Sequence, residues 1–176
     1  MSEAPRYREL KRDELTPEQQ AVFDAIAIPR GGVVPAPYHV LLESPELAQL
    51  TQALGAFCRY RTKLGSKSSE LLVLITAAYW EAEFEFAVHA REAAKAGIPA
   101  DVIESLRDHR VPDFADADSR LIYDFATSFF ATREVPDDLF EQAIARLGRR
   151  GVVELTGVLG CYSSLAILLR VFRVPA

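Results

Sequence analysis

Acidic side chains gather around one histidine between residues 70 and 92. Glu81, Glu85 and His89 stand four residues apart, and Glu92 follows three residues later. Because an α-helix completes one turn in 3.6 residues, a helix over this stretch places these four side chains along one stripe. Neighbouring carboxylates favour the protonated imidazole and so raise the pKa of a histidine. The stripe therefore indicates a candidate acid and base centre.

Two other interpretations of the stripe stay open at this point. It is compatible with a solvated helix face, on which a Glu85–His89 pair contributes about 0.3 kcal/mol. It is also compatible with a metal-assisted enzyme in which Glu85 and His89 supply two ligands. The sequence has no second Glu-x-x-His pattern and no third ligand at an obvious spacing, so we predict no metal site.

Composition narrows the class of protein. The chain has 176 residues, a net charge of −5 and 49% apolar residues, which is typical of one globular domain with a sizeable core. The acidic balance does not favour a nucleic-acid partner. Cys58 and Cys161 form no Cys-x-x-Cys pattern, which excludes zinc modules and disulfide scaffolds and predicts buried thiols in a reducing compartment.

No segment predicts a membrane anchor. The N-terminal residues do not resemble a signal peptide, and the longest uncharged stretch, residues 155–169, is shorter than the roughly 20 apolar residues that span a bilayer. We expect no membrane partner, a buried core helix at 155–169 and a cytoplasmic protein.

Caps and apolar periodicity predict only helices. Prolines and glycines between residues 29 and 37 predict a loop, and no alternating β-branched run is present, so the predicted fold class is all-α. Gly157 and Gly160, inside the last helix, predict close approach by a neighbouring element. The helices are expected at about 17–27, 45–61, 67–96 with a bend near 80–83, 100–106, 116–132, 136–147 and 152–172.

The segment from Glu70 to Gly97 resembles the carboxymuconolactone decarboxylase and alkyl hydroperoxidase D superfamily. The superfamily's peroxidase pattern is Glu, eleven residues, Cys, two residues, Cys, three residues, His, and the matching positions here are Glu70, Ala82, Glu85 and His89. Residues 37–47 and 152–175 resemble its flanking helices. The resemblance implies an alkyl hydroperoxidase D-like helical domain over 35–176, after a helix and loop extension over 1–34, and a homo-oligomer, trimeric or hexameric.

The missing cysteines change the expected reaction. Ala82 and Glu85 carry no sulfur, so thiol peroxidase activity is not expected. The resemblance instead implies a cofactor-free decarboxylase or isomerase acting on a small lactone or enone carboxylate. In that interpretation His89 is the general acid, Glu70 orients it and Glu85 is a second acid or base. The alternatives are the metal-assisted enzyme and a non-catalytic, ligand-binding oligomeric domain.

Further residues are candidates for binding the substrate. Trp80, Phe86 and Tyr162 are expected to form an apolar wall, and Glu83 belongs to a Glu-aromatic-Glu pattern seen in the decarboxylase-like branch. A carboxylate substrate also needs a cation. The candidates for that cation are Arg91, Arg59, Arg61 and Lys63. His39, in the loop expected before the second helix, is a candidate to close over the pocket.

Overall fold

The computed structural model describes residues 6–175, and every regular element within that range is helical, which confirms the all-α fold class. Two 3-10 turns, Arg12–Glu14 and Ile28–Arg30, flank the first α-helix. The α-helices are α1 (Pro17–Ala27), α2 (Ala36–Leu41), α3 (Pro45–Tyr60), α4 (Gly65–Tyr79), α5 (Glu83–Lys95), α6 (Ala100–Arg107), α7 (Ala117–Thr132) and α8 (Asp137–Phe172).

Local sequence signals account for most helix boundaries. The hydroxyl of Thr16 accepts a hydrogen bond from the backbone N–H of Gln19, and the Gln19 side chain accepts one from the N–H of Thr16, so a capping box starts α1. The bend predicted near residues 80–83 is present, because α4 ends at Tyr79 and Glu81 adopts a φ of 51°. The consequence is that α4 and α5 form a helical hairpin.

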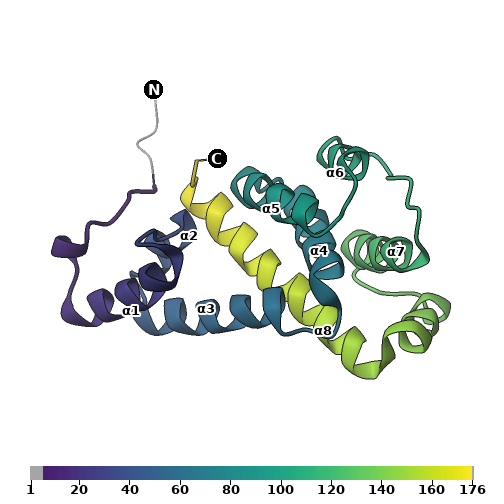
Figure 1. Cartoon of the computed structure of the whole chain (residues 1–176), viewed down its shortest axis with the longest axis horizontal. Helices are drawn as coiled ribbons and strands as arrows, with labels where there is room; N and C mark the ends of the chain where they lie inside the picture. The colour runs from purple at the N-terminus through teal and green to yellow at the C-terminus, as the bar shows by residue number, and fades with distance from the viewer. Residues whose placement is uncertain (1–5, 176) are drawn as a thin grey trace.

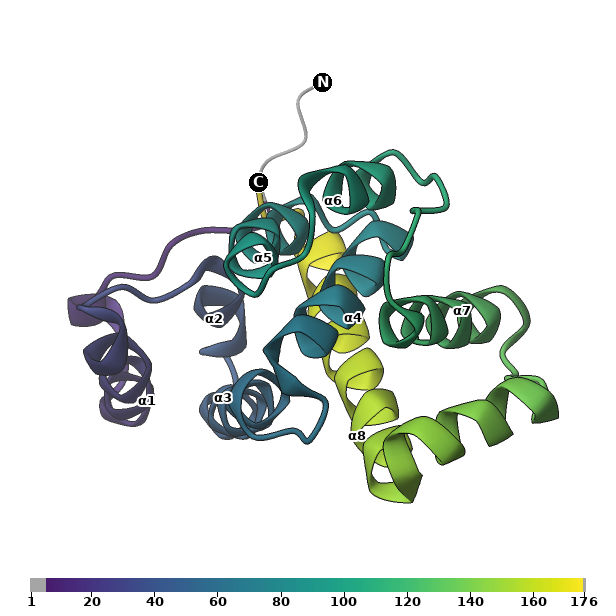
Figure 2. The same cartoon turned by 45° about the vertical axis from the view of Figure 1, so that its right-hand side comes forward.

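Two helices make up the centre of the molecule, α4 and the second part of α8 (Figures 1 and 2). All seven residues from Leu71 to Ala77 are buried, so α4 is covered on every side. Figure 2 shows α5 and α6 over one end of this pair and α7 beside it, while α1, α2 and α3 lie on the other side. The α4–α5 hairpin is thereby held rigidly against α8.

Helix α8 is the one helix in residues 6–175 that is long and apolar enough to cross a membrane by length and composition. Its most apolar window has a mean hydropathy of 1.8, and 56% of that window is buried inside the molecule. The buried side contacts α4, α7 and α3. The apolar character of α8 is therefore explained by its packing at the centre of the domain, as the sequence predicts for 155–169.

A sharp kink divides α8 at Gly148. This residue has φ 70° and ψ 165°, which is not a helical conformation, and the chain changes direction there (Figure 2). The sequence predicts two separate helices with a break at this glycine, and the kink is that break. Residues other than glycine are rarely found in this region of φ and ψ.

Replacing Gly148 with alanine is expected to lower the free energy of unfolding by about 1–3 kcal/mol. The cause is backbone strain alone, because a Cβ at this position meets no atom within 4 Å. Gly157→Ala is the matched control: Gly157 is helical and a Cβ there also meets open space, so alanine is expected to stabilise by up to about 1 kcal/mol. Urea denaturation measures both, and equal effects of the two substitutions would contradict this account.

Two expectations from the sequence are corrected by the structure. Residues 36–41 form a helix instead of a loop, since Pro37 stands in the first turn, where a missing N–H has no cost. On α3 the leucines point outward, with Leu50 61% exposed, and the buried side holds the small residues Ala48, Gly55 and Cys58. A Cβ on Gly157 or Gly160 meets no atom within 4 Å, so no neighbouring element approaches them closely within the described chain.

Candidate functional site

The α4–α5 hairpin brings Glu70 and His89 into contact. Because the two helices run in opposite directions from the bend at residues 80–82, Glu70 in the second turn of α4 lies opposite His89 in α5. Nδ1 of His89 lies 2.6 Å from a carboxylate oxygen of Glu70, and Nε2 lies 3.2 Å from a carboxylate oxygen of Glu85. Both ring nitrogens therefore have a carboxylate partner.

All three side chains of this cluster are buried, each with 5% relative exposure. Burial lowers the pKa of His89, but the hydrogen bonds and charges of Glu70 and Glu85 outweigh burial and raise it to about 9. At neutral pH His89 is therefore an imidazolium that donates one N–H to each carboxylate. This is a proton donor held between two acceptors in a site largely shielded from water.

Glu85 and His89 line a cavity of about 130 Å³ between α2, α3, α5 and α8. The ring of Tyr162, from α8, meets the imidazole edge-on at a centroid distance of 5.1 Å. Burial and the charge of Glu85 raise the pKa of Tyr162, so its hydroxyl stays protonated at neutral pH. The remaining lining residues are Arg30, Pro35, Pro37, Tyr38, Gly55, Ala56, Arg59, Tyr60, Phe84, Val88 and Leu165.

Arg59 connects the cavity to the Glu70 side of the cluster. Its Nε lies 3.5 Å from Glu70, and a terminal nitrogen lies 3.4 Å from Glu92. These are ion pairs at distances too long for strong hydrogen bonds, and the buried Nε has no hydrogen-bond partner within the described chain. Arg59 therefore places a cation on the wall of the cavity, next to Glu70.

The structure places seven of the sequence-predicted residues away from this cavity. Trp80 lines a different cavity, and Phe86 is buried beneath the guanidinium of Arg107. Four others are exposed and do not line the cavity, namely Arg61, Lys63, Glu83 and Arg91. The expectation that His39 closes over the pocket is wrong. His39 is buried in α2, and its Nδ1 accepts a hydrogen bond from the backbone N–H of Leu10 at 3.1 Å, which fixes it in the core.

The sequence-predicted residues that do line the cavity are Glu85, His89 and Tyr162, with Arg59 from the list of candidate cations. Glu70 does not line it and contacts His89 and Arg59. Arg30 and Tyr38 were not predicted. Arg30 lies over the ring of Tyr38, with 5.7 Å between the guanidinium carbon and the ring centroid. Arg30 ends the 3-10 turn after α1, and Tyr38 lies in the first turn of α2. Both are far from residue 70 in the sequence, and no local sequence pattern identifies them as site residues.

The described residues contain neither a cluster of metal ligands nor an exposed cysteine. No group of three or more His, Cys, Asp or Glu side chains in residues 6–175 is arranged to hold a metal ion, and both nitrogens of His89 already face carboxylates. Cys58 and Cys161 are free thiols, 1% and 3% exposed. A hydrogen bond with Cys58, together with burial, raises the pKa of Cys161, which makes this thiol a poor nucleophile.

The sequence of this chain matches no known family, but its structure resembles solved structures. No protein-family model matches the sequence, and no curated protein matches it significantly. Among solved structures, an uncharacterized peroxidase-related protein from Silicibacter sp. TM1040 matches with a TM-score of 0.79 and 17% identity, over 97% of this chain and 91% of that one. A variant of the debrominase Bmp8, in complex with 2,3,4-tribromopyrrole, matches with a TM-score of 0.76 and 13% identity, over 98% and 92%.

These likenesses extend over almost the whole of each chain, so they describe the complete helical arrangement and not a shared pair of helices. Identities of 13% and 17% are too low to transfer a reaction or a substrate. What they support is the fold expected from the Glu70-to-His89 segment. The chain has an alkyl hydroperoxidase D-like fold, of the kind shared by that superfamily and the carboxymuconolactone decarboxylases.

Proposed function

We propose that the protein is a cofactor-free acid–base enzyme, a decarboxylase or isomerase acting on a small lactone or enone carboxylate. The observation that supports it is the imidazolium of His89, held between Glu70 and Glu85 on the wall of a small cavity. A volume of about 130 Å³ admits only a small molecule. A buried acid with both of its protons positioned is the group that such a reaction needs.

The proposed reaction uses the substrate itself to hold the electrons. When the bond to the carboxylate breaks, carbon dioxide leaves and its electron pair moves into the conjugated carbonyl, which becomes a dienolate. His89 then gives its Nε2 proton to carbon, the carbonyl re-forms, and the imidazole regains a proton from solvent by way of Glu85. Isomerisation follows the same route, except that the substrate loses a C–H proton to Glu85 and keeps its carboxylate.

The charges around the cavity favour an anionic substrate. The charged groups that line it are three cations, Arg30, Arg59 and protonated His89, and one carboxylate, Glu85. Arg59, on the wall of the cavity, is the proposed partner for a carboxylate of the substrate. Tyr162 and Phe84 supply an apolar wall that excludes water.

A substrate panel tests this function. Small unsaturated lactone carboxylates and enone carboxylates are incubated with the protein, and carbon dioxide release or a shift of the double bond is followed. Turnover is expected for the free acids. Loss of carbon dioxide needs a free carboxylate, so methyl esters are compared in the isomerisation assay only. There they are expected to react slower by roughly tenfold or more, since the ester cannot form the ion pair with Arg59. Arg59→Gln is expected to raise KM for the acids and leave the esters unchanged. Equal rates for acids and esters would contradict the anionic substrate.

We also propose a cytoplasmic homo-oligomer, trimeric or hexameric. The outward stripe of α3 supports the assembly, because Leu47, Leu50 and Leu54 are 50%, 61% and 45% exposed and contiguous along one helix face. A second copy would remove this apolar surface from water. Light scattering of the purified protein is expected to give three or six times the mass of 19.5 kDa; a monomeric mass would overturn the assembly.

A further inference from the structure

A second cavity, larger than the His89 cavity, lies apart from the His89 site. It has a volume of about 580 Å³ and lies between the end of α4, the second half of α7 and α8. None of the residues that line it lines the His89 cavity. The volume falls in the range of sites for drug-sized ligands, several times larger than the His89 cavity. It therefore needs an explanation of its own.

Six aromatic side chains line this cavity, from Tyr79 and Trp80 to Phe125, Phe129, Phe130 and Phe140. Tyr79 stacks on Phe130 with 4.2 Å between ring centroids and 8° between ring planes, and it meets Trp80 edge-on at 5.3 Å. Phe129 and Phe140 are 39% and 40% exposed, which leaves their rings available to a ligand. Flat rings presented in this way favour a flat, aromatic partner.

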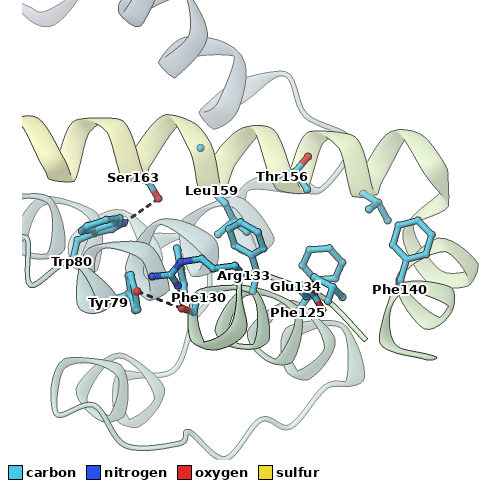
Figure 3. Close-up of a pocket in the computed structure, with 14 residues that line it drawn as sticks. Tyr79, Trp80, Phe125, Phe130, Arg133, Glu134, Phe140, Thr156, Leu159 and Ser163 are labelled. Atoms are coloured by element: carbon cyan, nitrogen blue, oxygen red, sulfur yellow. Dashed lines mark hydrogen bonds between the residues drawn. The ribbon is translucent and has the colours of Figure 1, made fainter. Parts of the chain in front are cut away.

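Helix α8 forms the opposite wall. Figure 3 shows Thr156, Leu159 and Ser163 of α8 facing the aromatic residues of α4 and α7. The hydroxyl of Ser163 accepts a hydrogen bond from the indole N–H of Trp80 at 3.0 Å, which fixes the indole at one end of the cavity. Gly160 lies on the same wall, and a Cβ there would meet open space, so the missing side chain keeps the cavity wide.

One cation marks the end of the cavity near Tyr79. The Arg133 guanidinium and the Tyr79 hydroxyl both donate to the backbone carbonyl of Phe130, so they lie close together. Arg133 forms no ion pair within residues 6–175. The one carboxylate among the lining residues, Glu134, lies toward Phe125 in Figure 3. A guanidinium without an ion pair beside stacked rings is suited to an anionic group on an aromatic molecule.

We propose that this cavity is a second binding site, for a planar aromatic anion of two or more rings. The rings lie between the aromatic wall and α8 at Gly160, and the anionic group lies at Arg133. The site is independent of the proposed reaction at His89, because the two cavities share no residue. A ligand of this size does not fit the His89 cavity, so binding at the two sites can be told apart.

The probe for this site is 8-anilinonaphthalene-1-sulfonate, a two-part aromatic anion, with uncharged N-phenyl-1-naphthylamine as its matched neutral partner. Trp80 is the single tryptophan of the chain, so energy transfer from its fluorescence reports binding. Saturable binding of one sulfonate per chain is expected. Arg133→Gln is expected to weaken the sulfonate roughly fivefold to tenfold and leave the neutral amine unchanged.

A second pair of variants tests the location without disturbing the fold. Gly160→Leu fills the cavity from α8 and is expected to weaken both probes by roughly tenfold or more, while leucine is a better helix former than glycine. Gly157→Leu changes the same helix outside the cavity and is expected to leave binding unchanged. No saturable binding to the wild type, or equal binding by both leucine variants, would overturn the proposal. A Gly160→Leu chain that loses an oligomeric mass would also overturn it, by showing that a second copy covers this face.

Discussion

Replacing His89 with glutamine is expected to reduce turnover of the substrate found in the panel by about 10²–10⁴-fold, the usual contribution of a positioned general acid. Glutamine keeps one N–H donor for Glu70 or Glu85 but has no proton to transfer. The effect should fall on kcat, since His89 gives up its proton in the transition state and holds it in the ground state. Steady-state kinetics with circular dichroism as a check on folding measures it.

The two carboxylates distinguish acid catalysis from simple packing. Glu70→Gln removes the partner at 2.6 Å, so the pKa of His89 should fall and the alkaline limb of the kcat profile should move to lower pH. Glu85→Gln leaves that partner in place but removes the acid or base on the cavity wall, so kcat should fall with a smaller shift of the profile. Turnover by His89→Gln equal to wild type would remove His89 from the mechanism.

Raising the pH from 6.5 to about 9 is expected to cost the wild-type protein about 3 kcal/mol of unfolding free energy through His89 alone. The folded state holds this proton with a pKa of about 9, against 6.5 for an ordinary histidine. Below pH 6.5 both states are protonated and the stabilisation is complete. Between pH 6.5 and 9 only the folded state keeps the proton, and above pH 9 neither does, so the contribution is lost as pH rises.

The comparison with His89→Gln isolates this contribution. Urea denaturation of both proteins at several pH values between 6 and 9.5 gives the difference in unfolding free energy, in which the other titrating groups cancel. Burial lowers the pKa of His39, so its own transition lies below this window. If the unfolding free energies of wild type and His89→Gln change in parallel with pH, His89 titrates normally and is not held as an imidazolium between Glu70 and Glu85.

The helices were predictable because their signals are local. The capping box at Thr16, the bend before Glu83 and the break at Gly148 are each encoded within a few residues. Helix α2 was missed because prolines at 35 and 37 were interpreted as loop formers, although proline fits the first turn of a helix. Periodicity identified the leucines that share a face of α3 but not which face is covered, since that depends on packing with distant elements.

The candidate site was predictable only in part for the same reason. The predicted stripe of Glu81, Glu85, His89 and Glu92 requires one continuous helix. Because the chain turns at Glu81, this side chain leaves the stripe and forms an ion pair with Arg170. The contact between Glu70 and His89 depends on the hairpin, so spacing alone does not give it. Arg30 and Tyr38 reach the cavity from elements some 50 residues before His89, and nothing local to either residue signals this.

Nuclear magnetic resonance titration of the His89 ring tests the central claim most directly. The chain has three histidines, so ¹⁵N-labelled spectra are simple and the His89→Gln variant assigns the signal. We predict that both ring nitrogens of His89 carry protons at pH 7, that the pKa is about 9, and that Glu70→Gln lowers it. A pKa near 6.5 that Glu70→Gln leaves unchanged would contradict the imidazolium held between two carboxylates, and with it the proposed acid.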